Sequence, residues 1–280
     1  MKTRIGHVDI GYDRAGSGDA VLLVMGLGTT RMAWFNQVSY LSRRYDVTAF
    51  DNRGCGETVC SGSWTVLDMA ADAIGVADAM GYERFHLVGV SMGGMIAQEV
   101  ALAAPDRIQT LTLISTSAGG PQAVPPTNEY LAAFALPDMR QRVARSIELL
   151  FGPTYRREHP EVVKAAIDLS LGAGSGAAGA SMFDAETDAA GFMTQLTAIT
   201  TWMLMGGAAA RLEQIRMPTL VMHGGSDLLV PVANGKLIAD GIAGSRLRIW
   251  DDAGHALIHE HADDVNDELG THLASAAVGT

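Results

Sequence analysis

Cysteine and basic residues are scarce in this chain. The 280 residues include two cysteines, Cys55 and Cys60, which form no Cys-x-x-Cys motif. Two cysteines alone cannot make a four-ligand zinc site, and we expect both thiols to be reduced. Lys and Arg number 20 against 31 Asp and Glu, which gives a formal net charge of −11. Such a surface repels phosphate backbones and anionic lipids, so we expect no nucleic-acid or membrane partner.

Long apolar runs are also missing near the start of the chain. The run at residues 20–25 is far shorter than the roughly 20 apolar residues that cross a bilayer. Residues 1–9 contain one Lys and one Arg but no apolar stretch typical of a secretory signal peptide. We therefore expect a cytoplasmic protein. With 48% hydrophobic and 18% charged residues, most of the chain has the composition of a folded protein.

Short apolar runs alternate with helical patterns in both halves of the chain. The runs at residues 20–25, 45–50, 85–90 and 111–114 lack polar alternation, which is typical of strands covered on both faces. Thr65 and Asp68 predict a capping box at the start of one helix. The alternation predicts an α/β fold with a doubly wound, mostly parallel sheet. The expected strands cover residues 20–25, 45–50, 85–90, 111–114, 219–222 and 246–250, and the expected helices cover residues 66–80, 92–104, 232–242 and 263–274.

The alternation is interrupted between residues 119 and 211. The tract 172–180 contains only Gly, Ala and Ser, whose side chains are too small to pack a core. The sequence therefore predicts one α/β core, residues 1–118 and 212–280, that carries a helical insertion at residues 119–211. Within the insertion, the pattern indicates helices at residues 129–136, 139–151, 161–171 and 188–205.

A serine lies where a predicted buried strand meets a helix. The string Gly-Val-Ser-Met-Gly at residues 89–93 ends one expected strand and begins the next helix. In that position Gly-x-Ser-x-Gly forms a sharp turn that holds the serine hydroxyl at the carboxyl end of the sheet. Ser91 could instead serve only as a helix N-cap. The flanking glycines, with Gly94 beside them, favour a nucleophile.

A histidine and an aspartate follow two later strands. A serine hydroxyl is a weak nucleophile unless a base removes its proton. Asp227 lies just after the expected strand 219–222, and His255 lies in the loop after the strand 246–250. The chain order Ser91, Asp227, His255 is that of one serine hydrolase architecture. We therefore predict a catalytic triad in which His255 is the base and Asp227 orients it.

Other groups near these strand ends are weaker candidates. The aspartates at residues 251–252 are too close in sequence to His255 to be aimed easily at its far ring nitrogen. His255, His259 and His261, together with Glu260, could suggest a metal cluster, but His259 and His261 lie at or near a helix start and no second group of ligands is in view. The sequence therefore predicts neither a metal nor a cofactor.

Two loops are candidates for an oxyanion hole, which needs backbone N–H groups aimed at the developing negative charge. Met92, directly after Ser91, is expected to supply one N–H. A second is expected from the Met-Gly-Leu-Gly loop at residues 25–28, because its glycines allow a close approach of the backbone. The same loop could be an ordinary strand-to-helix turn, but the presence of Ser91 favours the functional interpretation.

Taken together, these residues resemble the α/β-hydrolase superfamily over residues 8–117 and 212–274. Members of that family usually have His-Gly-x-Gly where this chain has Met-Gly-Leu-Gly at residues 25–28. The resemblance implies that Leu27 N–H is the second oxyanion donor, beside that of Met92. Because the hole uses backbone groups, the missing histidine bears on the substrate class and leaves the mechanism unchanged.

Other features carry the resemblance further. The Asp-Asn-Arg-Gly-Cys-Gly string at residues 51–56 is similar to a structural turn of the family. Together with the loop 25–28, it resembles a branch that includes anthracycline methyl esterases and lactonase-like hydrolases. Ser91 stands where haloalkane dehalogenases and epoxide hydrolases have an aspartate, so an alkyl-enzyme route is disfavoured. The resemblance also implies that the insertion 119–211 is a cap over the active site.

The predicted function is hydrolysis of a small, apolar carboxylic ester or lactone through an acyl-enzyme intermediate. The same triad would serve a carbon–carbon bond hydrolase or a cofactor-free perhydrolase, and these alternatives remain open. A ligand-binding protein that keeps the fold with little turnover is a further alternative. A metal-dependent hydrolase would lose its activity to chelators. Assembly into a homo-oligomer also remains open.

Overall fold

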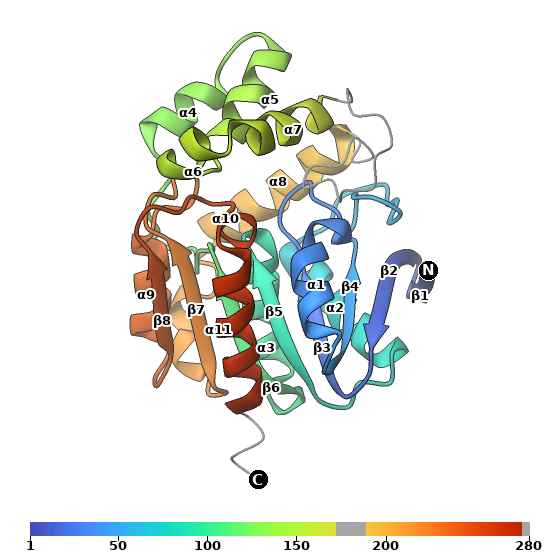
Figure 1. Cartoon of the computed structure of the whole chain (residues 1–280). Helices are drawn as coiled ribbons and strands as arrows, with labels where there is room; N and C mark the ends of the chain where they lie inside the picture. The colour runs from blue at the N-terminus through green and yellow to red at the C-terminus, as the bar shows by residue number, and fades with distance from the viewer. Residues whose placement is uncertain (172–188, 276–280) are drawn as a thin grey trace.

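The computed structural model describes residues 1–171 and 189–275 of the chain. In these residues the strands are β1 (Lys2–Ile5), β2 (Val8–Gly16), β3 (Asp19–Val24), β4 (Tyr45–Phe50), β5 (Phe85–Val90), β6 (Ile108–Ile114), β7 (Thr219–Gly224) and β8 (Arg246–Trp250). They form one sheet in the order β1-β2-β4-β3-β5-β6-β7-β8 (Figure 1). β2 pairs antiparallel with β1 and β4, and all later pairs are parallel. The predicted mostly parallel sheet is confirmed.

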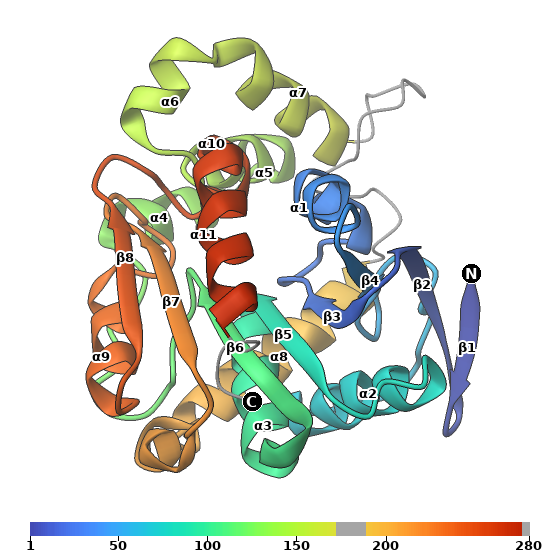
Figure 2. The same ribbon diagram turned by 60° about the horizontal axis from the view of Figure 1, so that its bottom comes forward.

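Helices cover both faces of this sheet (Figure 2). Those of the core are α1 (Phe35–Leu41), α2 (Val66–Ala79), α3 (Met92–Ala103), α9 (Ala233–Gly241), α10 (Leu257–Glu260) and α11 (Ala262–Ser275), with short 3-10 helices at Arg31–Trp34, Pro105–Arg107 and Ala209–Gln214. α1 and α11 share an apolar cluster with Val21 and Leu23 of β3, whereas α2, α3 and α9 share one with Leu22 and Val24. Successive side chains of a strand point to opposite faces, so β3 is buried on both sides.

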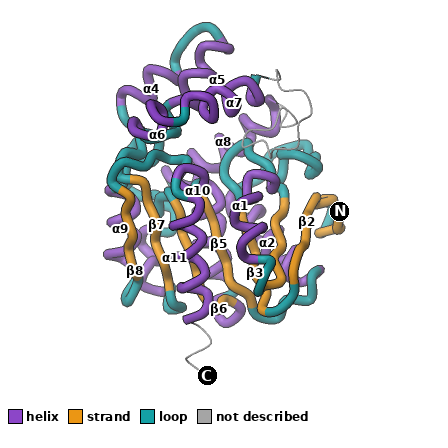
Figure 3. The backbone as a smooth tube through the Cα atoms, in the orientation of Figure 1, coloured by secondary structure: helices purple, strands orange, loops and turns teal. Residues whose placement is uncertain are grey.

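The cap consists of helices at the carboxyl edge of the sheet (Figures 1 and 3). They are α4 (Asn128–Phe134), α5 (Met139–Glu148), α6 (Pro153–Glu158), α7 (Pro160–Ser170) and α8 (Ala189–Leu204). The first four share their own apolar cluster around Tyr130, whereas Ala198 and Trp202 of α8 pack into the cluster of α2 and α3. The predicted helical cap is confirmed. Its division from the core at residues 119 and 211 stays a prediction, and the tract 172–180 lies outside the described residues.

Several element boundaries follow from local signals in the sequence. Thr65 Oγ1 accepts the N–H of Asp68 at 3.2 Å, and Asp68 Oδ2 accepts the N–H of Thr65 at 2.8 Å, so the predicted capping box forms. β6 begins at Ile108 instead of residue 111, and α5 ends at Glu148 instead of residue 151.

In the described part of the chain, no helix is both long and apolar enough to cross a membrane.

Candidate active site

Ser91 lies at the sharp turn between β5 and α3. Its backbone has φ 55° and ψ −121°, a conformation that costs free energy in a residue with a side chain. Two neighbours hold the turn: Ser91 N–H donates to Ile114 O at 2.9 Å, and the Thr116 hydroxyl donates to Ser91 O at 2.7 Å. The strained turn therefore holds Ser91 at the carboxyl edge of the sheet with its side chain partly exposed.

Glycines beside Ser91 are required by the close packing of the turn. A Cβ atom on Gly93 would lie 2.0 Å from Val24 O, and one on Gly89 would lie 2.2 Å from Gly93 O. A Cβ atom on Gly94 would lie 2.6 Å from the Thr116 side chain. No side chain fits at Gly89 or Gly93 without moving the backbone, so the chain crosses itself closely at this turn, and a side chain at Gly94 would displace Thr116.

The structure brings Ser91, His255 and Asp227 together from three strand ends. His255 Nε2 lies 3.0 Å from Ser91 Oγ, and His255 Nδ1 lies 2.7 Å from Asp227 Oδ2. The His255 side chain is 10% exposed, whereas that of Asp227 is 0% exposed. A continuous hydrogen-bonded chain thus runs from a buried carboxylate to a hydroxyl that solvent can reach. This arrangement can take a proton from the hydroxyl and stabilise the charge that the imidazole gains.

A tight turn after β7 fixes the Asp227 carboxylate. Its Oδ1 accepts the backbone N–H groups of Leu229 at 2.9 Å and Val230 at 2.8 Å. His223 supports the same turn, because its Nε2 lies 2.7 Å from Val230 O and must carry the proton of that bond. His223 Nε2 also lies 3.6 Å from Asp227 Oδ2. Burial lowers the pKa of His223, so its imidazole is a neutral donor within this turn.

The loop 25–28 and the start of α3 flank Ser91, as the sequence predicts. A Cβ atom on Gly26 would lie only 3.1 Å from Ser91 Cβ, so this loop passes directly beside the serine. Leu27 follows Gly26 in the loop. Met92 is the first residue of α3, where a backbone N–H has no carbonyl partner within the helix. The two loops with the predicted donors therefore meet at Ser91, and the roles of Leu27 N–H and Met92 N–H stay predictions.

Glu260 is a partly buried acid whose role the sequence does not reveal. Its Oε1 accepts Gly254 N–H at 2.9 Å, and its Oε2 accepts Gly152 N–H at 3.0 Å. It thereby joins the residue before His255 to the start of cap helix α6. Burial raises the pKa of the Glu260 carboxyl to about 7, against the two N–H donors and with help from the charges of Asp227 and Asp252.

The neighbours of Glu260 also have partners of their own. The His259 ring stacks on Phe35 at 5.8 Å between ring centroids, and burial lowers its pKa to about 4. Among residues 1–171 and 189–275, no group of three or more His, Cys, Asp or Glu side chains could hold a metal ion. The polar groups at residues 259–260 thus serve packing and backbone hydrogen bonds.

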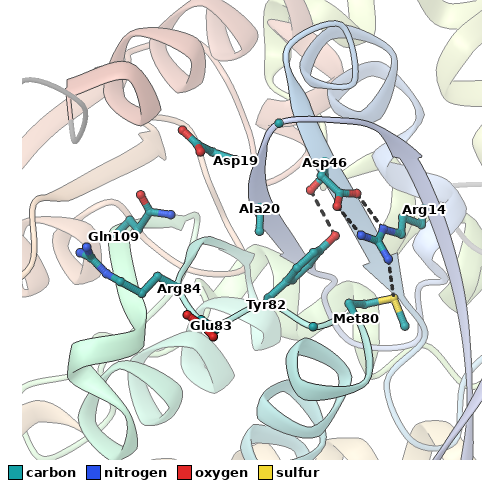
Figure 4. A pocket seen from close by; sticks show the side chains of 11 residues that line it. Arg14, Asp19, Ala20, Asp46, Met80, Tyr82, Glu83, Arg84 and Gln109 are labelled. Atoms are coloured by element: carbon teal, nitrogen blue, oxygen red, sulfur yellow. Dashed lines mark hydrogen bonds and ion pairs between the residues drawn. The ribbon is translucent and has the colours of Figure 1, made fainter.

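A surface hollow of about 480 Å³ lies at the opposite end of the sheet (Figure 4). Asp19 at the start of β3 and Arg84 just before β5 line it, whereas Ser91 follows the carboxyl end of β5. Arg14 pairs with Asp46 on one wall of this hollow, with Arg14 Nε 2.8 Å from Asp46 Oδ1 (Figure 4). The hollow is separate from the site at Ser91.

The sheet order and the serine turn are those of the α/β-hydrolase fold, and sequence comparison agrees. The family described as alpha/beta hydrolase fold matches residues 19–262, and the chain belongs to that family. A protein of Azorhizobium caulinodans named as a carbamate hydrolase is 30% identical over 268 residues, which is 94% of each chain. The chain is therefore a member of a hydrolase family.

Solved structures resemble the whole chain. Est816, described as an N-acyl homoserine lactone degrading enzyme, has 27% identity and a TM-score of 0.78, with 97% of this chain and 99% of that chain covered. An enol-lactonase from Burkholderia xenovorans LB400 has 24% identity and a TM-score of 0.81, covering 98% of this chain and 100% of that one. The second similarity bears on the fold alone.

Proposed function

We propose that this protein is a serine hydrolase that cleaves a small, apolar carboxylic ester or lactone through an acyl-enzyme intermediate. The observation that carries the proposal is the hydrogen-bonded chain from Asp227 Oδ2 to His255 Nδ1 at 2.7 Å and from His255 Nε2 to Ser91 Oγ at 3.0 Å. Both distances are short enough for proton transfer, and the three groups are an acid, a base and a hydroxyl nucleophile in the order that such a triad requires.

The reaction would proceed in two halves. Ser91 Oγ attacks the carbonyl carbon while its proton moves to His255 Nε2, and the resulting imidazolium is stabilised by Asp227. The backbone N–H groups of Leu27 and Met92 hold the oxyanion. His255 then returns the proton to the departing alcohol oxygen, which leaves the acyl group on Ser91. Water attacks this ester with the same base, and the acid and the free enzyme are formed.

The names of two similar proteins support hydrolysis at an acyl carbon, but they point to different substrates. The Azorhizobium relative is named for carbamates and Est816 for acyl homoserine lactones. Both bond types have a carbonyl that a serine can attack, which leaves the triad chemistry the same and the substrate pocket different. We place the choice of substrate in the cap, since its helices lie over the carboxyl edge where Ser91 is found (Figure 1).

The test is a substrate panel on the wild type and the Ser91→Ala variant. The panel contains p-nitrophenyl esters of rising chain length, lactones, methyl esters and a carbamate. We expect hydrolysis of at least one ester or lactone, and a loss on the order of a million-fold in kcat for Ser91→Ala. Ser245→Ala is the matched control. Ser245 lies in the loop before β8, and its Oγ donates to the carbonyl oxygen of Ala239 in α9, so the change removes a serine hydroxyl outside the triad. Near wild-type rates in Ser91→Ala would overturn the proposal.

A fluorophosphonate probe separates an enzyme from a ligand-binding protein of the same fold. We expect covalent labelling of Ser91 at one probe per chain, together with turnover of the panel substrates. Labelling without release of product from any ester, lactone or carbamate would instead favour the ligand-binding alternative. Carbon–carbon bond hydrolysis or peroxide-dependent acid oxidation without ester cleavage would favour the other two alternatives.

A further inference from the structure

Cap helix α8 presents one buried face to the core. Gly191, Gln195, Ala198 and Trp202 are its buried residues, and they recur at the spacing of one helical face. Three of them suit an apolar or close-packed contact. Gln195 is a polar side chain with 0% exposure, which is costly unless its amide is fully hydrogen-bonded. Its partners therefore indicate why the amide is buried.

The Gln195 amide joins two loops of the core. Its Oε1 accepts Gly28 N–H at 2.8 Å, and its Nε2 donates to Arg53 O at 2.8 Å. Only this orientation of the amide satisfies both partners, because one is a donor and the other an acceptor. Gly28 is the residue directly after Leu27, so Gln195 bonds to the proposed oxyanion loop itself.

The Arg53 loop is a fixed support for this bridge. Arg53 Nη2 donates to Asp72 Oδ1 on α2 at 2.9 Å, which ties the loop to the core. In the same loop, Asn52 Nδ2 donates to Met25 O at 2.8 Å. Two amide side chains thus hold both ends of the loop 25–28: Asn52 holds its first carbonyl and Gln195 its last N–H. Leu27 N–H lies between these two points.

Close packing prevents α8 from sliding along these loops. A Cβ atom on Gly191 would lie 2.2 Å from Gly54 O, and one on Gly28 would lie 2.7 Å from the Phe192 ring. Gly28 also has φ +64°, a conformation in which glycine is favoured. These contacts fix the position of α8 against the two loops, and they thereby fix the position of the Gln195 amide.

We propose that Gln195 is a positioning residue for the oxyanion hole, through which the cap controls the rate of the chemical step. By holding Gly28 N–H, Gln195 fixes the amide end of the Leu27–Gly28 peptide, whose carbonyl oxygen accepts the Thr29 hydroxyl at 3.1 Å. This peptide sets the direction of the Gly26–Leu27 peptide before it, which carries the N–H aimed at the oxyanion. Removing the Gln195 bond loosens this stretch, because the glycines at positions 26 and 28 put few steric limits on its backbone. This inference rests on the proposed function, since it assigns Leu27 N–H to the oxyanion.

The first test compares Gln195→Met with Trp202→Phe. Met keeps the length of the side chain but makes neither hydrogen bond of Gln195. Phe removes the bond from Trp202 Nε1 to Glu99 Oε1, 2.7 Å long, which also joins α8 to the core but ends on α3 instead of on the loop 25–28. Both variants remove polar contacts of one helix face, so a general loosening of the cap would affect them alike.

The oxyanion forms only in the transition state, so the expected loss is in kcat. Removing a whole oxyanion donor costs about a hundred- to a thousandfold, and misaiming one should cost about ten- to a hundredfold in kcat for Gln195→Met. We expect KM to change less than about twofold, and affinity for a boronic acid that forms a tetrahedral adduct with Ser91 to fall with kcat. Trp202→Phe should keep kcat within about twofold of the wild type.

The proposal is overturned if Gln195→Met keeps kcat within about twofold, or if Trp202→Phe loses kcat to the same extent. If Gln195→Met does not fold, Gln195→Glu decides the question. A neutral carboxyl can accept from Gly28 and donate to Arg53 O, whereas a carboxylate is repelled by the Arg53 carbonyl oxygen and is displaced from the position that holds Gly28 N–H. The ratio of its kcat to that of the wild type should therefore rise as pH falls, and a ratio independent of pH contradicts the proposal.

These results are separate from the test of the function as a whole. If no ester, lactone or carbamate is cleaved by the wild type, or if Ser91→Ala retains activity, the proposed function fails. If the wild type and Ser91→Ala behave as expected and Gln195→Met is fully active, only the role of Gln195 fails.

Discussion

The two oxygens of Asp227 serve different partners, and the hydrogen bond to His255 is made by Oδ2. Asp227 Oδ2 lies 2.7 Å from His255 Nδ1, while Oδ1 accepts two backbone N–H groups from Leu229 and Val230. A carboxylate only accepts hydrogen bonds, so His255 Nδ1 must carry a proton. In the neutral imidazole this leaves Nε2 as the acceptor that faces Ser91 Oγ, the tautomer that a general base requires.

Asp227→Asn is expected to lower kcat about ten-thousandfold while the fold is kept. The N–H groups of Leu229 and Val230 select the amide oxygen at Oδ1, so the amide NH2 faces His255 Nδ1. The imidazole then has to accept there and carries its proton on Nε2, where it cannot take one from Ser91. Steady-state kinetics on the best panel substrate measure the loss. Asp251→Asn, an exposed change in the loop before His255, should leave kcat unchanged.

Gly93→Ala tests the close crossing beside Ser91. The new Cβ atom would lie 2.0 Å from Val24 O, so β3 or α3 has to move, and we expect a loss of about 3 kcal/mol in the free energy of unfolding. Gly244→Ala is the control, because Gly244 has φ +75° but nothing within 4 Å of the added Cβ. It should cost about 1 kcal/mol. Urea unfolding measures both, and equal losses would contradict the steric explanation.

Glu260→Gln should change how stability depends on pH. Burial raises the pKa of Glu260 from its ordinary value of 4.5 to about 7, so between these values the folded protein holds the proton more tightly than the unfolded chain. The contribution of this carboxyl to stability is therefore full below pH 4.5 and is lost as pH rises through about 7. Urea unfolding from pH 5 to 8 should show the wild type losing stability relative to Glu260→Gln. Parallel pH profiles would contradict the shift.

Chelators should leave hydrolysis unchanged. The proposed chemistry uses Ser91, His255 and backbone N–H groups, and the described residues contain no cluster of three or more potential metal ligands. Wild-type kcat after dialysis against EDTA is expected to equal that of the untreated protein. A loss that returns when Zn²⁺ is added would instead support a metal-dependent hydrolase.

Local signals explain how much of the fold the sequence predicts. β4, β5 and β8 have the predicted bounds because each is an apolar or alternating run that ends at a turn. The capping box fixes the start of α2. Since the carboxyl ends of parallel strands share one edge, the same reading places Ser91, Asp227 and His255 on that edge.

Features that depend on distant contacts could not be predicted in this way. α1 has only seven residues and is stabilised by packing on α11, and so its own sequence has little periodic signal. Gln195 looks like any polar residue of a helix until Gly28 and Arg53 meet its amide. Glu260 resembles a metal ligand in the sequence. Its actual partners, the N–H groups of Gly152 and Gly254, come from two loops that only the folded chain brings together.

The contacts of α8 also bear on how the substrate range of such a hydrolase can be engineered. A chimaera that exchanges the whole insertion would also replace Gln195, and with it a hydrogen bond that the core loop 25–28 needs. A graft limited to α4–α7, residues 128–170, would exchange most of the cap and leave the Gln195 bridge in place. The exchange point for such a chimaera thus lies inside the cap, between α7 and α8, so that α8 stays with the core.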